Sequence, residues 1–217
     1  MVLICGIDEA RRGPLIGDMV ICGVLIEENQ ERELKEIGAK DSKLLTQKQR
    51  EHLFKEILKI ITKYKTIIIS PQEIDDALNS EESNLNKLEA IKTAMIINHL
   101  KPDKVILDCP SVNIKSYVDY LKTFLKYEPK IKAEHKAEIH PSVAAASILA
   151  KVIAEEELKR LKEKYKIEFG SGYPSDPVTQ KFLKENYSKY PEIFRKTWAT
   201  YRNIAETKKQ KSLTDFR

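Results

Sequence analysis

Residues 2–14 read Val-Leu-Ile-Cys-Gly-Ile-Asp-Glu-Ala-Arg-Arg-Gly-Pro, an apolar run that passes into two adjacent carboxylates and then into a Gly-Pro turn. The apolar run predicts a buried strand. Burying Asp8 and Glu9 side by side is unfavourable, because each loses its hydration and the two charges repel each other. A divalent metal ion would offset both effects. A solvated turn, which is the commoner setting of an Asp-Glu pair, would need no ion.

The same pattern recurs further along the chain. Residues 105–107 form another apolar run that ends at Asp108, and a third acidic segment, residues 134–138, precedes the small-residue stretch 144–147. Acidic side chains at strand ends that lie far apart in sequence are the donors that an oxygen-ligated Mg²⁺ or Mn²⁺ site requires. The recurrence therefore favours a metal site over unrelated surface turns.

Hydrophobic periodicity predicts a mixed α/β protein. Strands are expected at residues 2–5, 19–26, 66–70, 104–107 and 129–132. Helices are expected at residues 46–63, from 71 onward for a short distance, and at 85–100, 111–127, 142–165, 177–187 and 191–204. Thr46 is a predicted N-cap, and Pro71 is a predicted first residue of its helix.

Composition restricts the class of protein. The chain has 217 residues, of which 41% are hydrophobic and 33% charged, as in a soluble globular protein. A formal net charge of +5 mildly favours a polyanionic partner. Cys5, Cys22 and Cys109 are too few and too widely spaced for a disulfide framework or a zinc site. Without a signal peptide or an apolar run of about 18 residues, we expect a cytoplasmic monomer that binds no membrane.

Nearly the whole chain resembles the type 2 ribonucleases H (ribonuclease HII) in their archaeal form. The motifs that carry the resemblance follow one another in a fixed order: Gly6-Ile7-Asp8-Glu9-Ala10, Arg12-Gly13-Pro14, Lys40-Asp41-Ser42-Lys43, Leu107-Asp108, Ala133-Glu134-His135-Lys136-Ala137, Ala145-Ala146-Ser147-Ile148-Leu149-Ala150-Lys151 and Gly170-Ser171-Gly172-Tyr173-Pro174-Ser175-Asp176-Pro177. Any one motif could arise by chance, whereas the ordered set is specific.

The resemblance implies a fold and a domain organisation. The expected fold is the α/β ribonuclease H-like fold, a five-stranded mixed sheet flanked by helices, with a small C-terminal helical part. Residues 1–168 would form the catalytic domain and residues 169–206 the C-terminal helical part that binds substrate. Residues 207–217 would form a tail that stays mobile until bound.

The resemblance also implies an activity. The chain would be an endonuclease that hydrolyses the RNA strand of RNA–DNA hybrids and nicks duplex DNA 5′ of single embedded ribonucleotides. Catalysis would use two Mg²⁺ or Mn²⁺ ions held by carboxylates, among them Asp8, Glu9 and Asp108.

The fourth carboxylate departs from the family pattern. The family has an Asp after His-Lys-Ala, where this chain has Glu138, and the segment from there to residue 145 is one residue shorter than usual. A gap-free alignment would place Ala137 at the acid position. We expect Glu138 to be the ligand, since its extra methylene can compensate for a short backbone shift, with Glu134 as the alternative.

A second departure lies at Arg11, where the family's Gly-Arg-Gly becomes Arg11-Arg12-Gly13. In the family this loop places its backbone against the 2′-hydroxyl and the adjoining phosphate. Arg11 could block that groove, strain the turn, point outward to contact a phosphate, or be a tolerated surface residue. If it obstructs, Arg11→Gly should raise activity on a single ribonucleotide.

The remaining substrate contacts follow from the resemblance. Tyr173 would stack on the sugar and sense the 2′-hydroxyl, although a tyrosine in such a loop is often only a packing anchor. Lys40, Ser42 and Lys43 would bind backbone phosphates, where isolated lysines would merely line a solvated loop. His135 could assist the site or simply be packed.

The C-terminal residues carry a separate motif. Gln210, Leu213 and Phe216 have the spacing of the sliding-clamp-binding peptide of replication proteins, with Arg217 in place of the usual second aromatic residue. In one helical turn Leu213 and Phe216 would share a face and fill an apolar pocket. The sequence therefore predicts a sliding clamp as a partner.

Two other functions are compatible with these residues. A clamp-tethered protein could bind RNA–DNA hybrids with catalysis impaired by the changes at Arg11 and Glu138. An integrase-like enzyme or other nuclease could share only the fold, although the Tyr173 loop argues against it. Metal-dependent nicking of a labelled duplex would separate the enzymatic from the non-enzymatic function.

Overall fold

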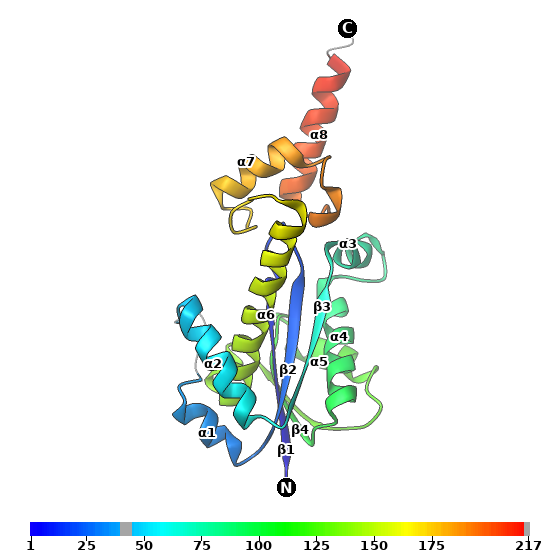
Figure 1. The fold of residues 1–217 in the computed structure, drawn as a ribbon. Helices are drawn as coiled ribbons and strands as arrows, with labels where there is room; N and C mark the ends of the chain where they lie inside the picture. The colour runs from blue at the N-terminus through cyan, green and yellow to red at the C-terminus, as the bar shows by residue number, and fades with distance from the viewer. Residues whose placement is uncertain (40–44, 215–217) are drawn as a thin grey trace.

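A computed structural model describes residues 1–39 and 45–214 and is built around one mixed sheet (Figure 1). The sheet has five strands in the order β3-β2-β1-β4-β5, which confirms the predicted five-stranded mixed sheet. β1 is antiparallel to β2, β2 is antiparallel to β3, and β4 is parallel to both β1 and β5. The bounds are β1 Leu3–Ala10, β2 Met19–Glu27, β3 Lys63–Ile69, β4 Lys104–Asp108 and β5 Lys130–Glu134.

Helices cover both faces of the sheet (Figure 1). One face packs against α1 Gln30–Glu36, α2 Gln47–Ile60 and α6 Pro141–Tyr165, and the other against α3 Pro71–Asn79, α4 Leu85–Leu100 and α5 Ile114–Lys122. β1 separates the two cores, because Ile4 faces the first and Cys5 the second. This alternation leaves Asp8 and Glu9 on opposite faces of the strand.

Close contact between β1 and α6 positions the site. A Cβ atom added to Gly6 would collide with the backbone of Ser142, so only glycine allows this approach. The helix presents the fully buried residues 144–147, all of which have small side chains. The glycine and the small-residue stretch together bring Ser147 beside Asp8, to which it hydrogen-bonds.

Most predicted helix starts are confirmed, and α4 has the predicted bounds. The Thr46 hydroxyl accepts from the amide of Gln49 in a capping box, and Pro71 is the first residue of α3. Helix α1, a seven-residue helix with Leu34 as its buried residue, was not predicted, because so short a helix shows little periodicity.

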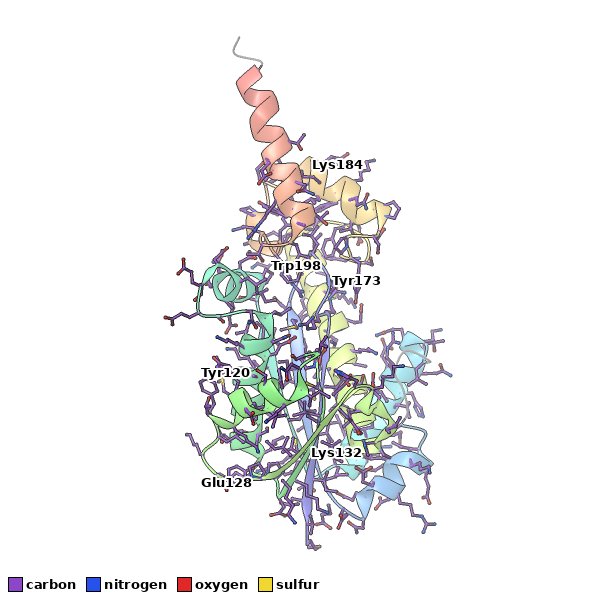
Figure 2. The ribbon with its side chains drawn as sticks, turned by 180° about the vertical axis from the view of Figure 1, so that it is seen from behind. Tyr120, Glu128, Lys132, Tyr173, Lys184 and Trp198 are labelled. Atoms are coloured by element: carbon purple, nitrogen blue, oxygen red, sulfur yellow. The ribbon has the colours of Figure 1, made fainter. Side chains whose placement is uncertain are left out.

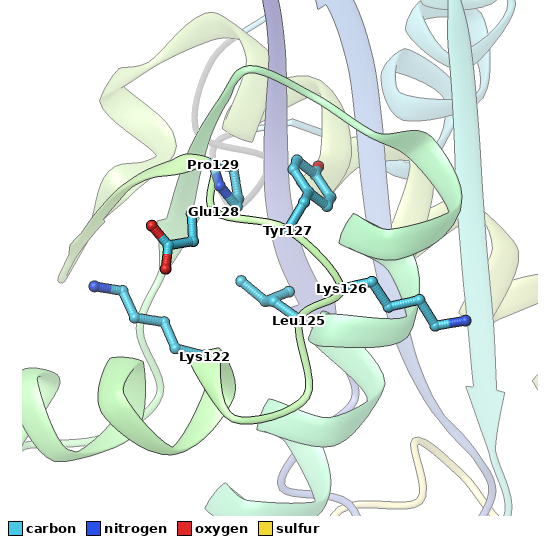
Figure 3. A pocket seen from close by; sticks show the side chains of 6 residues that line it. All are labelled: Lys122, Leu125, Lys126, Tyr127, Glu128 and Pro129. Atoms are coloured by element: carbon cyan, nitrogen blue, oxygen red, sulfur yellow. The ribbon is translucent and has the colours of Figure 1, made fainter.

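The predicted helix at 111–127 is wrong at both ends, because α5 spans only Ile114–Lys122. Asn98 of α4 donates to the carbonyl of Phe124 and accepts from the amide of Lys126, both at 2.9 Å. These two bonds hold residues 124–126 in a turn instead of a further helical turn. The resulting turn borders a pocket of about 510 Å³ (Figure 3), lined by Lys122, Leu125, Lys126, Tyr127, Glu128 and Pro129. The pocket lies at the N-terminal end of β5, whereas Asp108 lies at the C-terminal end of the parallel strand β4.

The C-terminal part has its own apolar core, which includes Phe169, Phe182 and Phe194. Its elements are α7 Pro177–Asn186, the 3-10 helix η3 Pro191–Ile193 and α8 Ala199–Thr214. The predicted helix at 191–204 therefore has the wrong bounds, since α8 begins at Ala199, continues to Thr214 and projects away from the sheet (Figure 1). Residues 199–214 contain no Gly or Pro and many good helix formers. The domain boundaries near residues 168 and 206 stay predictions.

The three cysteines are buried and unpaired. Among the helices in the described part of the chain, none combines the length and the apolar character needed to cross a membrane.

Candidate active site

Four carboxylates converge where β1 and β4 run side by side. Ile7 pairs with Leu107 in parallel register, so Asp8 and Asp108 follow at the same edge of the sheet. Glu138 lies in the adjoining 3-10 helix η2 (Ala137–Ile139). The Ala137 amide donates to Asp108 Oδ1 at 3.2 Å and thereby ties η2 to the end of β4.

The electrostatics show how closely these groups interact. Burial, together with the charges of Asp108 and Glu138, raises the pKa of Asp8 to about 7, although hydrogen bonds from Ser147 and the Glu9 amide act in the opposite direction. Burial raises the pKa of Glu9 well above its usual range, and the charges of Asp8, Glu89 and Asp108 add to the effect. Such clusters of perturbed carboxylates are typical of functional sites.

The donor set fits a hard divalent cation, because every predicted ligand is a carboxylate oxygen. Within residues 1–39 and 45–214, no three His, Cys, Asp or Glu side chains already stand at the spacing of a metal cage. The assignment therefore rests on converging charge rather than on preformed ligand distances. Carboxylates without a neighbouring cation repel one another, and bound ions would offset that repulsion.

The two candidates for the fourth ligand differ sharply in their surroundings. Glu138 is only 9% exposed and lies within electrostatic range of Asp8. Glu134 instead binds His140 Nε2 at 2.6 Å and Lys132 Nζ at 3.1 Å, and these partners lower its pKa. These contacts favour Glu138 over Glu134.

Arg11 adopts the left-handed conformation, with φ of 60°, that glycine would adopt without strain. Its side chain is 7% exposed and turns inward, where Nη2 donates to the carbonyls of Ile16 (3.0 Å) and Ser171 (3.1 Å). The suggestions that Arg11 points outward to a phosphate or is a surface residue are therefore wrong for the side chain. A backbone contact with substrate stays a prediction.

Arg12 is held by α4. Its Nε donates to Glu89 Oε1 and its Nη2 to Asn86 Oδ1, both at 2.8 Å. Glu89 is 1% exposed, and its charge acts on Glu9. Glu89 was not predicted to be near the site, since in sequence it is one polar position of an amphipathic helix.

Arg195 was also missed, yet it organises the β1–β2 loop (residues 11–18). The side chain is fully buried and donates to the carbonyls of Arg11 (2.7 Å), Arg12 (2.7 Å) and Gly17 (3.0 Å). Trp198 Nε1 donates to the carbonyl of Gly13 at 3.0 Å. These contacts span more than 170 residues of sequence, and no local pattern signals them.

We expect Arg195→Met to destabilise the protein by about 3 kcal/mol, because it leaves three buried or partly buried carbonyls without their donor. Chemical denaturation would measure the change. Arg202→Met is the matched control, since Arg202 is exposed on α8 and its loss should change stability by less than about 0.5 kcal/mol. Equal stabilities of the two variants would contradict the anchoring role of Arg195.

The Tyr173 loop (residues 170–176) lies against the β1–β2 loop. The carbonyl of Gly172 accepts from the amides of Leu15 (2.8 Å) and Ile16 (3.2 Å). Tyr173 is 42% exposed, and a Cβ added to Gly13 would lie 3.7 Å from its ring. Figure 2 labels Tyr173 and Trp198 at the junction of the sheet and the C-terminal part. The exposed Tyr173 ring and the backbone of Gly13, which has no side chain, thus form one surface.

Of the other predicted site residues, the structure describes some and not others. His135 Nδ1 lies 3.0 Å from the carbonyl of Cys109, so it packs against the segment that follows Asp108. Lys40, Ser42 and Lys43 lie outside the described residues, as does Phe216. Gln210 and Leu213 lie in α8.

Comparisons with known proteins agree with the fold. A family model described as Ribonuclease HII matches residues 5–201. The chain is similar to ribonuclease HII of Pyrococcus abyssi, at 44% identity over 97% of this chain and 95% of that protein. It is similar to the crystal structure of ribonuclease H2 from Pyrococcus horikoshii OT3, with a TM-score of 0.86, 44% identity and coverage of 95% and 98% of the two chains. It is also similar to a chain of the PCNA:RNase HII complex from Archaeoglobus fulgidus, with a TM-score of 0.82, 40% identity and coverage of 93% and 96%.

Proposed function

The chain belongs to the ribonuclease HII family of endoribonucleases that cleave RNA–DNA hybrids, and from this premise we propose that Asp8, Glu9, Asp108 and Glu138 carry out its hydrolysis. The observation that supports the assignment is the convergence of these buried or partly buried carboxylates near the ends of β1 and β4. The ribonuclease H-like fold brings them together from three separate parts of the sequence.

The proposed mechanism uses two divalent ions, for which carboxylate oxygens are suitable donors. When bound, such ions activate the attacking water and stabilise the departing 3′-oxygen. Asp8, fixed by the Ser147 hydroxyl, and Asp108, fixed by the Ala137 amide, would hold the ions at the sheet edge. Glu9 and Glu138 would complete the set of oxygen donors.

We further propose nicking 5′ of a single ribonucleotide in duplex DNA. The 2′-hydroxyl is the feature that distinguishes such a nucleotide from its neighbours. The surface formed by Gly13 and Tyr173 could detect it, because backbone and ring there lie side by side and the ring is exposed. The phosphate contacts predicted for Lys40, Ser42 and Lys43 would fix the register of the duplex.

A duplex with one ribonucleotide and an end label tests both steps. We expect one cut, 5′ of the ribonucleotide, that leaves a 3′-hydroxyl, requires Mg²⁺ or Mn²⁺ and is abolished by EDTA. A continuous RNA–DNA hybrid serves as the reference substrate. Binding of both duplexes without cleavage in either metal would favour the catalytically impaired hybrid-binding protein instead.

We also propose that residues 210–216 bind a sliding clamp. The motif supports this, as does a relative with 40% identity whose structure was solved as a PCNA:RNase HII complex. Leu213 and Phe216 would supply the apolar anchors and Gln210 a polar contact.

Replacing Phe216 by alanine should therefore weaken clamp binding at least about tenfold, since it removes one of two apolar anchors. Calorimetry with the cognate clamp would measure the affinity, which we expect to be on the order of micromolar for the natural chain. Nicking of a short free duplex should not change. If truncation after Thr207 leaves the affinity unaltered, the clamp binds elsewhere.

A further inference from the structure

Arg11 is fastened at several points although it adopts a conformation that side chains disfavour. Its φ of 60° is left-handed, and such strain persists only where the surroundings impose it. Arg195 holds the backbone through the Arg11 carbonyl, and the Arg11 guanidinium adds a second restraint, because Nη2 donates to the carbonyls of Ile16 and Ser171 and Nη1 lies 3.9 Å from Glu155 Oε1. The side chain therefore links three segments: the β1–β2 loop, the Tyr173 loop and α6.

The contacts with the Tyr173 loop surround Gly172. The Ser171 carbonyl accepts from Arg11, and the Tyr173 ring centroid lies 5.9 Å from the Arg11 guanidinium carbon. A Cβ added to Gly172 itself would lie 2.7 Å from Arg11 Nη2, so the guanidinium packs directly on this backbone. Arg11 thus supports both residues that flank Gly172.

Other bonds hold the base of the Tyr173 loop without Arg11. The Gly172 carbonyl accepts the amides of Leu15 and Ile16, and its amide donates to Thr179 Oγ1. Asp176 binds the amide and hydroxyl of Ser171. Loss of the guanidinium should therefore leave the loop attached at its base but free the orientation of the exposed Tyr173 ring.

We propose that Arg11 is a positioning residue that fixes the Tyr173 ring beside Gly13 and thereby sets the preference for an isolated ribonucleotide over a continuous hybrid. The proposal rests on the function proposed above. A continuous hybrid offers a 2′-hydroxyl at every RNA position, so a loosely held ring still finds one. A single ribonucleotide offers one position, and recognition then depends on the ring being held in place. This gives the opposite expectation to an obstructing Arg11.

Three substitutions isolate the guanidinium. Arg11→Met keeps the side-chain length and the same backbone strain but removes every donor. Arg11→Lys keeps the charge but loses the rigid planar guanidinium, whose Nη2 reaches both carbonyls while Nη1 faces Glu155. Glu155→Gln is the matched control: it removes only the 3.9 Å ion pair with a half-exposed partner, and exposed pairs contribute little.

The readout is the ratio of kcat/KM for the single-ribonucleotide duplex to kcat/KM for the continuous hybrid. We expect Arg11→Met to lower this ratio roughly tenfold and Arg11→Lys roughly threefold, with Glu155→Gln within twofold of the natural chain. In a Tyr173→Ala background, Arg11→Met should no longer change the ratio, because its effect passes through the ring. An undiminished effect of Arg11→Met in that background would overturn the proposal, as would an unchanged ratio in the single variant.

Amide hydrogen exchange provides a test that needs no cleavage. Within residues 170–176, Arg11→Met should speed exchange of the Tyr173 and Asp176 amides at least about threefold, whereas the Ser171 and Gly172 amides, which bind Asp176 and Thr179, should change less. Emission from Trp198, the single tryptophan, should stay unchanged, since it reports on the contact with Gly13. Unchanged exchange in residues 170–176 would overturn the positioning role. If the natural chain fails to nick the single-ribonucleotide duplex, the proposed selectivity is wrong, and the exchange experiment still decides whether Arg11 holds the loop.

Discussion

Replacing Asp8 or Asp108 by asparagine is expected to lower metal-dependent cleavage of an RNA–DNA hybrid by roughly a thousandfold or more, while the protein stays folded. Each change removes one anionic oxygen from the proposed metal site and preserves the shape of the side chain. Asp8 receives hydrogen bonds from the Ser147 hydroxyl and the Glu9 amide, and the carbonyl oxygen of asparagine can still accept the bond that the Glu9 amide donates to Oδ1. The loss should therefore be one of charge rather than of packing.

The effect on stability should have the opposite sign. A pKa of about 7 in place of 3.8 for Asp8 corresponds to roughly 4 kcal/mol of unfavourable free energy for the buried charged form. In chelator at pH 8, Asp8→Asn should hold or raise the melting temperature. In the natural chain the folded state binds the extra proton, so its stability should fall as pH rises from about 4 through about 7.

Asp119→Asn is the matched control, because Asp119 is an exposed residue of α5 and is not one of the four carboxylates. Cleavage rates with saturating Mg²⁺ and melting curves in chelator would be measured side by side for all three variants. Cleavage by Asp8→Asn within tenfold of the natural chain would refute its role as a metal ligand.

The strands and long helices could be predicted because each has a local cause. β2 is nearly uniformly buried and reads as a β-branched apolar run, and α4 has an Asn cap at Asn84 and an apolar pattern up to Leu100. The bounds of α5 and α8 could not be predicted in the same way. α5 ends where Asn98, on another helix, binds the chain, and α8 continues because no residue in 199–214 stops it.

The site residues differ in the same way: some have a local sequence signal and others do not. Asp8, Glu9 and Asp108 were predictable, because a charge at the end of an apolar strand is conspicuous in sequence. Arg195 and Glu89 were not, since an arginine in a polar segment and a glutamate in a helix become informative only through what they bind. The inward turn of Arg11 also depends on residues 155 and 171, which the sequence places far away.

The fourth carboxylate gives the second large expected effect. Glu138→Gln should lower cleavage of a continuous hybrid roughly a hundredfold, whereas Glu134→Gln should stay within about threefold, since exposed ion pairs contribute little. The two variants make the same chemical change four residues apart. Glu138 is 9% exposed beside Asp8, while Glu134 binds Lys132 and His140 at the surface.

Mn²⁺ binding, measured by calorimetry without substrate, separates a ligand from a residue that only shapes the loop. Glu138→Gln should weaken Mn²⁺ binding, and Glu134→Gln should leave it unchanged. Glu138→Asp tests the reach of the side chain, because it keeps the charge but shortens the chain by one methylene. Since the segment after Glu138 is short by one residue, we expect the aspartate to recover only part of the lost activity. The opposite ranking, with Glu134→Gln the weaker enzyme and the weaker Mn²⁺ binder, would mean that the shortened segment has moved the acid position to Glu134.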